Sequence, residues 1–238
     1  MCAIAQKHMC AYVAYLPLIV DHSAYWDCRE LLSNAPGVRL VDDPAEQDLL
    51  EQLLEASKPS LPKAARGLHY LLATPFRYAP PHPSRFRPAH AKGQWYGAET
   101  LAAACAEVAY WRHRFVQDSA GLRDQTLLTE HTFFQGVLQG PAIDLSQPPW
   151  QAARAQWTHP DDYGATHAVA RAAPAHGVQW IRYASARAAG QHCAVALVPD
   201  CLREPDGGLD RTQQTWHCKA TAQRVMFTRG RERWAWDF

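Results

Sequence analysis

The sequence predicts a single compact α+β domain of mixed α/β type that carries a helical extension at its N-terminal end. Segments with helical periodicity alternate with short apolar runs that are typical of strands. The 238 residues, 47% of them hydrophobic and 20% charged, suffice for one domain with a sizeable core. No internal repeat, low-complexity tract or flexible linker divides the chain. We therefore expect residues 1–65 to form an extension that packs on a main domain of residues 66–238.

The extension is expected to contain an early strand and one helix. The apolar run at residues 9–20 resembles the core of a signal peptide, but no small-residue cleavage site follows, and the run is too short to span a bilayer. A buried first strand is therefore favoured, with a second short strand at residues 37–41. A helix near residues 44–57 is predicted by Asp43 as N-cap, by the proline that follows it, and by Glu46, which completes a capping box.

The main domain is expected to begin with an irregular loop. Residues 74–90 include five prolines in seventeen residues, which excludes a regular helix or a central strand. A strand at residues 93–98 follows, and Thr100 is a good N-cap for a helix that continues to about Phe115. The buried stripe predicted for this helix consists of Leu101, Ala104, Cys105, Val108, Trp111 and Phe115.

The second half of the chain is predicted to supply most of the sheet. Two short strands around a Gly-Pro turn are expected within 129–146, and core strands are expected at 178–185 and 193–199. A helix is expected over 158–177, with Pro160 near its start and Pro174 shortening its end. A hairpin around Gly230 is expected to close the domain.

Composition excludes several classes of function. The formal net charge is +1, so the overall charge of the chain does not favour binding to nucleic acid or to a membrane surface. The seven cysteines are odd in number and form no CxxC pair, which suits free thiols in a reducing compartment. No stretch is a membrane candidate, and the cytoplasm is the expected location. No zinc-ligand spacing, GxGxxG, P-loop or GxSxG motif is present.

Charged residues around the Pro-rich loop suggest an anion-binding site. Arg77, Arg85 and Arg87 stand close together on a stiff backbone, and arginine binds phosphate in bidentate fashion, although surface ion pairs are the common alternative. Glu107 lies on the flank of the predicted buried stripe of its helix. Carboxylates are rarely buried without a partner or a role, but a single flanking glutamate is more often a solvated edge residue.

Two further positions suggest ligand contacts, and the C-terminal tail suggests an alternative. Trp95 and Tyr96 alternate on a strand, so one packs in the core while the other faces the opposite side, where it could stack on a flat ring. Ser185 lies at the end of an apolar strand, a place where functional groups are often found, although a serine there is more often part of a turn. Arginines and tryptophans of the tail could bind RNA by stacking, but a charged hairpin face is the preferred interpretation.

The order of these motifs closely resembles the RES-domain family. "FRYAPP", "SRFRP", "WYGAET" with "AEVAYWR", "WIRYASARAAG" and "VALVPD" follow one another as they do in that family, and the resemblance covers about residues 39–202. It implies a toxin of a bacterial RES–Xre toxin–antitoxin module. The implied fold is similar to that of ADP-ribosyltransferases, with a twisted mixed sheet split around an NAD cleft. NAD would be the substrate, with no additional cofactor.

The resemblance also implies partners for the chain. An Xre-type antitoxin would neutralise it, in a homodimer or a toxin–antitoxin hetero-oligomer, without a membrane and without direct binding of nucleic acid. The chain departs from the family at Ser84, where glycine is common, at Gly97, where a bulkier residue is usual, at Cys193, where asparagine is frequent, and at Pro174.

The resemblance assigns roles to the residues that match its motifs. Glu107, Arg77 and Ser185 are implied to be catalytic; Arg77, Tyr78, Arg85, Tyr96 and Ser185 are implied to bind NAD, and no metal is implied. Glu107 would stabilise positive charge on the ribose, and Tyr96 would stack on nicotinamide. Arg77 and Arg85 would hold the diphosphate, and Ser185 would bind the ribose or the carboxamide.

The expected activity is cleavage of the nicotinamide–ribose bond by hydrolysis or phosphorolysis, which would deplete NAD and arrest growth. Transfer of ADP-ribose to a cellular protein is the first alternative. The second is a protein that binds a nucleotide without catalysis.

Overall fold

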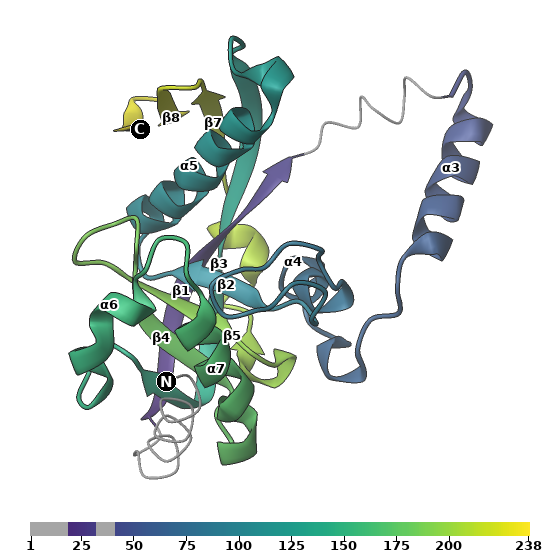
Figure 1. The fold of residues 1–238 in the computed structure, drawn as a ribbon. Coiled ribbons are helices and arrows are strands. Elements are labelled where there is room, and N and C mark those ends of the chain that lie inside the picture. The colour runs from purple at the N-terminus through teal and green to yellow at the C-terminus, as the bar shows by residue number, and fades with distance from the viewer. Residues whose placement is uncertain (1–18, 32–40) are drawn as a thin grey trace.

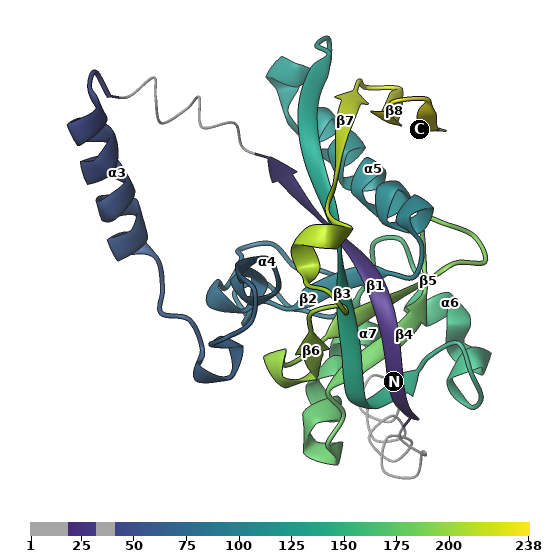
Figure 2. The same cartoon turned by 180° about the vertical axis from the view of Figure 1, so that it is seen from behind.

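One long strand, β3 (Leu127–Asp144), organises the fold. The computed structural model describes residues 19–31 and 41–238, and it shows the mixed α+β architecture that the sequence predicts (Figures 1 and 2). β1 (Ile19–Leu31) pairs along its whole length with residues 130–142 of β3, in antiparallel fashion. The remaining strands are β2 (Trp95–Ala98), β4 (Trp180–Ala184), β5 (His192–Ala196), β6 (Leu202–Arg203), β7 (Gln214–Ala220), β8 (Arg224–Arg229) and β9 (Glu232–Asp237).

The sheet has the strand order β1-β2-β5-β4-β3-β7-β8-β9, and β6 pairs with β3. Only β3 and β4 are parallel among these pairings of the described chain. β1 pairs with both β2 and β3, so hydrogen-bonded pairing forms a closed ring of the five strands β1, β2, β5, β4 and β3. The C-terminal strands β7, β8 and β9 extend the sheet as a meander, and the last two form the predicted hairpin.

Side chains of successive residues on β3 enter two different cores, because they point to opposite faces of the sheet. Phe133 belongs to the larger core, which also includes the buried side of α5 (Leu101–Asp118). Phe134 belongs to a second core on the other face, beneath α4 (Tyr70–Ala73). The two short helices α6 (Arg154–Trp157) and α7 (Gly164–Ala172) complete the cover of the larger core.

The predicted helix at residues 44–57 is present as α3 (Pro44–Ser57), and Asp43 caps it by accepting a hydrogen bond from the Glu46 amide at 2.9 Å. Its leucines differ from the expected packing, since α3 buries none of its residues and Leu49, Leu53 and Leu54 are exposed. The helix stands apart from the rest of the fold in both views (Figures 1 and 2).

The first described segment of the chain is a strand. Residues 19–31 form β1, which lies within the main sheet. Most of the apolar run at 9–20 and of the strand predicted at 37–41 lies outside the described residues.

Two predicted elements of the second half are corrected by the structure. Residues 129–146 do not form two strands, because β3 continues straight through Gly140, which adopts a φ of +101°, and through the proline after it. The helix predicted at 158–177 is shorter, since α7 begins only at Gly164. Asp161 and Asp162 donate their amide hydrogens to Nδ1 of His159 before it begins, so this segment forms a turn.

Helix α5 begins as predicted, with Thr100 Oγ1 accepting a hydrogen bond from the Ala103 amide at 3.2 Å. Its buried face is centred on alanines and Val116, whereas Trp111 and Phe115 are half exposed. The predicted stripe was therefore wrong at these two aromatic residues. Small side chains let the helix lie close to the sheet, and the large rings remain at the edge of the contact.

Candidate functional site

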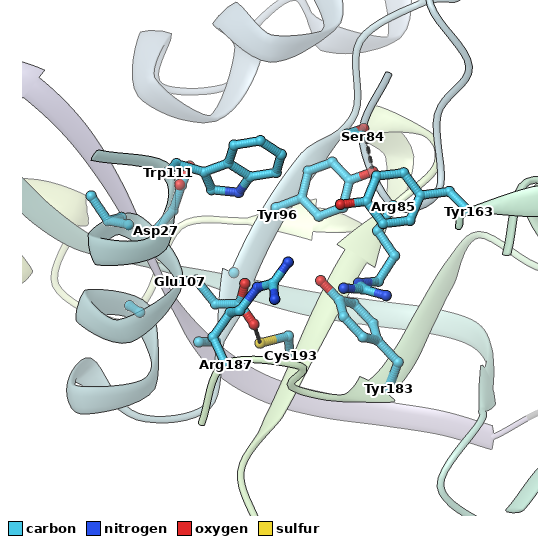
Figure 3. A pocket seen from close by; sticks show the side chains of 14 residues that line it. Asp27, Ser84, Arg85, Tyr96, Glu107, Trp111, Tyr163, Tyr183, Arg187 and Cys193 are labelled. Carbon is cyan, nitrogen blue, oxygen red and sulfur yellow. Dashed lines mark hydrogen bonds between the residues drawn. The ribbon is translucent and has the colours of Figure 1, made fainter. Parts of the chain in front are cut away.

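A pocket of about 250 Å³ lies where α5, β2, β4, β5 and the Pro-rich loop meet (Figure 3). It brings together Arg85, Tyr96 and Glu107, which come from three successive segments of the chain and were singled out from the sequence. The full lining consists of Asp27, Ser84, Arg85, Tyr96, Gly97, Ala98, Ala104, Glu107, Val108, Trp111, Tyr163, Tyr183, Arg187 and Cys193. Ser185 reaches the same place through a hydrogen bond to Glu107.

Ser185 fixes the carboxylate of Glu107. It is buried directly after β4, and its hydroxyl oxygen accepts the amide hydrogens of Arg187 at 3.1 Å and Ala188 at 2.9 Å. A serine hydroxyl has one hydrogen and two lone pairs, so these contacts leave the hydrogen to be donated. Ser185 donates it to Glu107 Oε1 at 2.6 Å, a distance typical of a charge-assisted hydrogen bond. The turn after β4 thus determines where the carboxylate points.

Cys193 lies on the same side of the carboxylate as Ser185. Its sulfur is 3.8 Å from Glu107 Oε1, a weak contact in which the thiol donates. Burial, followed by the charge of Glu107, holds the pKa of the Cys193 thiol well above its usual range, so the thiol stays protonated. Both donors therefore use Oε1, and within the described residues Oε2 is the oxygen left for a ligand.

Arg85 holds the Pro-rich loop in place at the pocket wall. Its side chain is buried, and Nη1 donates to the carbonyl oxygens of Trp157 and His159, each at 2.9 Å. The guanidinium carbon lies 5.1 Å from the centre of the Tyr163 ring. The hydroxyl of Thr166 in α7 donates to the Arg85 carbonyl. The residue is both a structural anchor and a positive charge at the pocket.

Arg87, the third arginine of this region, has a different role. It is buried, and its guanidinium group donates to three carbonyl oxygens of its own loop, those of Pro80, Pro88 and His82. It does not line the pocket. Proline has no amide hydrogen to organise such a loop, and Arg87 supplies hydrogen-bond donors in its place.

Tyr96 is positioned by its hydroxyl group. The oxygen lies 2.8 Å from Ser84 Oγ, accepts the Phe86 amide hydrogen at 3.1 Å, and donates to Gln94 Oε1 at 3.0 Å. Burial raises the pKa of Tyr96 to about 12, so the phenol is neutral at physiological pH. Trp95 points to the opposite face and is fully buried in the second core, as the alternation on this strand predicts.

The structure does not bring Arg77 and Tyr78 to this pocket. Arg77 Nη1 pairs with Glu55 Oε1 of α3 at 3.3 Å. Tyr78 borders a different hollow against the end of α3. The Tyr78 carbonyl accepts the Gly93 amide hydrogen at 2.8 Å, and a Cβ at Gly93 would meet the Pro75 carbonyl oxygen. Neither side chain lines the pocket at Glu107.

Most of the lining residues were not predicted as site residues from the sequence, and these include Asp27, Trp111, Tyr163, Tyr183 and Arg187. Asp27 comes from β1, in the part of the chain that the sequence assigned to an extension. No local signal could have found it, because its place depends on pairing between distant strands. Arg187 had a signal, since it is the second residue after Ser185.

The described residues contain no cluster of three or more His, Cys, Asp or Glu side chains that could hold a metal ion. Among the same residues, no helix is both long and apolar enough to cross a bilayer.

The fold and the pocket define a mixed α+β protein with an oriented carboxylate at a ligand-sized cavity. The model of the RES domain matches residues 61–219, which is most of the chain, and the chain belongs to the RES-domain family. A chain of the crystal structure of the M. tuberculosis MbcT–MbcA toxin–antitoxin complex is similar at 14% identity, with a TM-score of 0.48, over 91% of this chain and 92% of that chain. No curated protein matches the sequence.

Proposed function

We propose that this RES-domain chain is the toxin of a toxin–antitoxin module and that it consumes NAD by cleaving the nicotinamide–ribose bond. The loss of NAD would arrest growth. An antitoxin of the Xre type would be its neutralising partner, as the resemblance of the sequence to RES–Xre modules implies.

The observation that carries the proposal is the oriented carboxylate of Glu107. Ser185 and Cys193 hold Oε1, and Oε2 remains for a ligand within the described part of the chain. Tyr96 lines the same cavity and offers an aromatic ring, and Arg85 and Arg187 offer positive charge. A carboxylate, an aromatic ring and guanidinium groups are the groups needed for a sugar cation, a flat base and phosphates.

Cleavage of the nicotinamide–ribose bond builds positive charge on the ribose. Glu107 would stabilise this charge and hold a ribose hydroxyl through Oε2. The bonding electrons leave with nicotinamide, which becomes neutral, so no strong general acid is needed. Tyr96 stays neutral because its pKa is about 12, and burial raises the pKa of Tyr183 well above its usual range. These tyrosines would therefore pack against the substrate rather than exchange protons with it.

The size of the cavity suggests how NAD would lie. At about 250 Å³ it is slightly smaller than typical sites for drug-sized ligands, which measure roughly 300–1,000 Å³. It suits the nicotinamide riboside half of NAD, and the adenosine half would extend past the rim. Trp111 is half exposed at the edge of the pocket and could cover that half.

Incubation of the purified protein with NAD, with and without phosphate, followed by mass spectrometry, tests the activity and identifies the acceptor. We expect free nicotinamide with ADP-ribose if water is the acceptor, and a phosphorylated ADP-ribose if phosphate is. Expression without a partner should arrest growth and lower cellular NAD. Growth arrest with an unchanged NAD pool, and no nicotinamide released by the pure protein, would refute the proposal.

A further inference from the structure

Two arginines, Arg85 and Arg187, line the pocket, and they are not equally available to a ligand. From the sequence, Arg77 and Arg85 were expected to hold the diphosphate of NAD. Arg77 instead pairs with Glu55 of α3, so one of the two expected positive charges is missing from the pocket. Arg187 is the arginine that the tertiary structure brings there in its place.

The backbone of Arg187 is fixed by the residue that orients the carboxylate. Its amide donates to Ser185 Oγ at 3.1 Å, and the same oxygen belongs to the hydroxyl that donates to Glu107. The turn after β4 therefore sets the positions of the carboxylate and of the guanidinium group together. Figure 3 shows this guanidinium group reaching into the pocket between Glu107 and Tyr183.

The side chain of Arg187 is held over an aromatic ring. The guanidinium carbon lies 3.3 Å from the centre of the Tyr110 ring, and Nη2 donates to the Pro160 carbonyl at 3.0 Å. Stacking on an aromatic face orients the guanidinium plane without consuming its in-plane N–H groups. The group is thereby ordered before a ligand arrives, and this lowers the entropic cost of binding.

The donors of Arg187 are less occupied than those of Arg85. An arginine carries five N–H donors. Nη1 of Arg85 already serves two carbonyl oxygens, whereas Arg187 gives a single Nη2 contact to the protein among the described residues. Because this contact uses one of the two Nη2 hydrogens, Arg187 keeps a pair of parallel donors, either Nε with Nη2 or Nη1 with Nη2. Such a pair in a fixed plane matches the oxygens of a phosphate group.

We propose that Arg187 is a substrate-binding residue of the pocket that contacts the diphosphate of the nucleotide, the role that the sequence assigned to Arg77. This inference rests on the proposed function for the identity of the nucleotide. Tyr110 acts as a positioning residue, because it holds the guanidinium plane. Arg85 adds positive charge at the pocket wall, where its Nη1 is committed to the carbonyl oxygens of Trp157 and His159.

Binding of ADP and of adenosine to the full chain, measured by calorimetry, tests this role. The two probes differ only in the diphosphate, so the ratio of their dissociation constants reports the phosphate contact. We expect Arg187→Gln to reduce the preference for ADP over adenosine about ten- to a hundredfold, as for loss of a charge-assisted hydrogen bond. Arg231→Gln, at an exposed turn, is the matched control and should keep the wild-type preference. Arg77→Gln tests the assignment made from the sequence.

An unchanged preference for ADP over adenosine in Arg187→Gln would overturn the inference. This includes the case in which the variant binds both probes equally less tightly, which would indicate a collapsed pocket. A wild-type protein that does not prefer ADP would also overturn it. Loss of the preference in Arg77→Gln alone would return the role to that residue. Failure of the proposed function is a separate outcome, recognised by the absence of nicotinamide release from NAD by the wild-type protein.

Discussion

Replacement of Glu107 by glutamine is the most direct test of the pocket, because it removes one negative charge and changes the shape very little. The side-chain carbonyl oxygen of the glutamine can still accept the hydroxyl of Ser185, and the amide nitrogen then takes the place of Oε2. A hydrogen-bond donor would face the ribose where an acceptor is needed. Loss of one electrostatic contact of this kind typically costs about 10²–10³ in rate, or about 3–4 kcal/mol of transition-state stabilisation.

Release of nicotinamide from NAD, followed by chromatography at saturating substrate, measures this loss. Glu232→Gln changes an exposed glutamate of the C-terminal hairpin and is the matched control, which should keep the wild-type rate. Circular dichroism and a thermal melt establish that both variants are folded. A folded Glu107→Gln protein that consumes NAD at the wild-type rate would refute the assignment.

Ser185 allows a sharper version of the same test. If Ser185 acts only by orienting Glu107, Ser185→Ala should slow the reaction about ten- to a hundredfold, as for one hydrogen bond to a charged group. The double variant should then be no slower than Glu107→Gln alone, because the carboxylate that Ser185 orients is already lost. Additive losses would show that Ser185 contacts the substrate independently, which is the role that the sequence suggested.

Three further predictions concern stability. Burial, and then the charge of a nearby arginine, lowers the pKa of His131 from 6.5 to about 4, so the unfolded chain binds more protons between these values. The free energy of unfolding should therefore fall by about 3 kcal/mol as the pH drops from 6.5 to 4, and His131→Gln should flatten this dependence in urea titrations. Tyr96→Phe keeps the ring but leaves a loop amide without its acceptor. It should cost about 1–3 kcal/mol in urea unfolding and retain most NAD turnover, whereas a large loss of turnover would give the hydroxyl a catalytic role. Arg182→Met removes the partner of Asp144 and Glu99, at 2.7 and 2.6 Å. It should cost about 2–3 kcal/mol in the same assay, less than for a fully buried pair because Arg182 is partly exposed, and an unchanged midpoint would contradict a stabilising network.

Local chemistry allowed several elements to be predicted from the sequence. The capping box at Asp43, the cap at Thr100 and the turn at Gly230 are interactions within a few residues, and each element begins or turns where the sequence predicts. The order of motifs was also sufficient to indicate the RES-domain family, which the family model confirms. Glu107, Tyr96, Arg85 and Ser185 were named from the sequence, and the structure places all four at one pocket.

The sequence alone misjudged features that depend on distant contacts. β3 was divided at Gly140 because a Gly-Pro pair usually marks a turn, but pairing with β1 on one side and β4 on the other keeps the strand continuous. Trp111 and Phe115 were expected to be buried because they follow a helical repeat. The neighbours of α5 decide which flank of that repeat meets the sheet.

Membership of the site was likewise decided by the tertiary structure. Arg77 and Arg187 have the same side chain, and each lies within a motif that resembles the family. Arg77 pairs with Glu55 of α3 and does not line the pocket, whereas Arg187, held by the Ser185 turn and the Tyr110 ring, does. The sequence by itself determined which side chains could perform the chemistry. Only packing between segments that are far apart along the chain could decide which of them meet, because spacing along a chain does not determine distance in space.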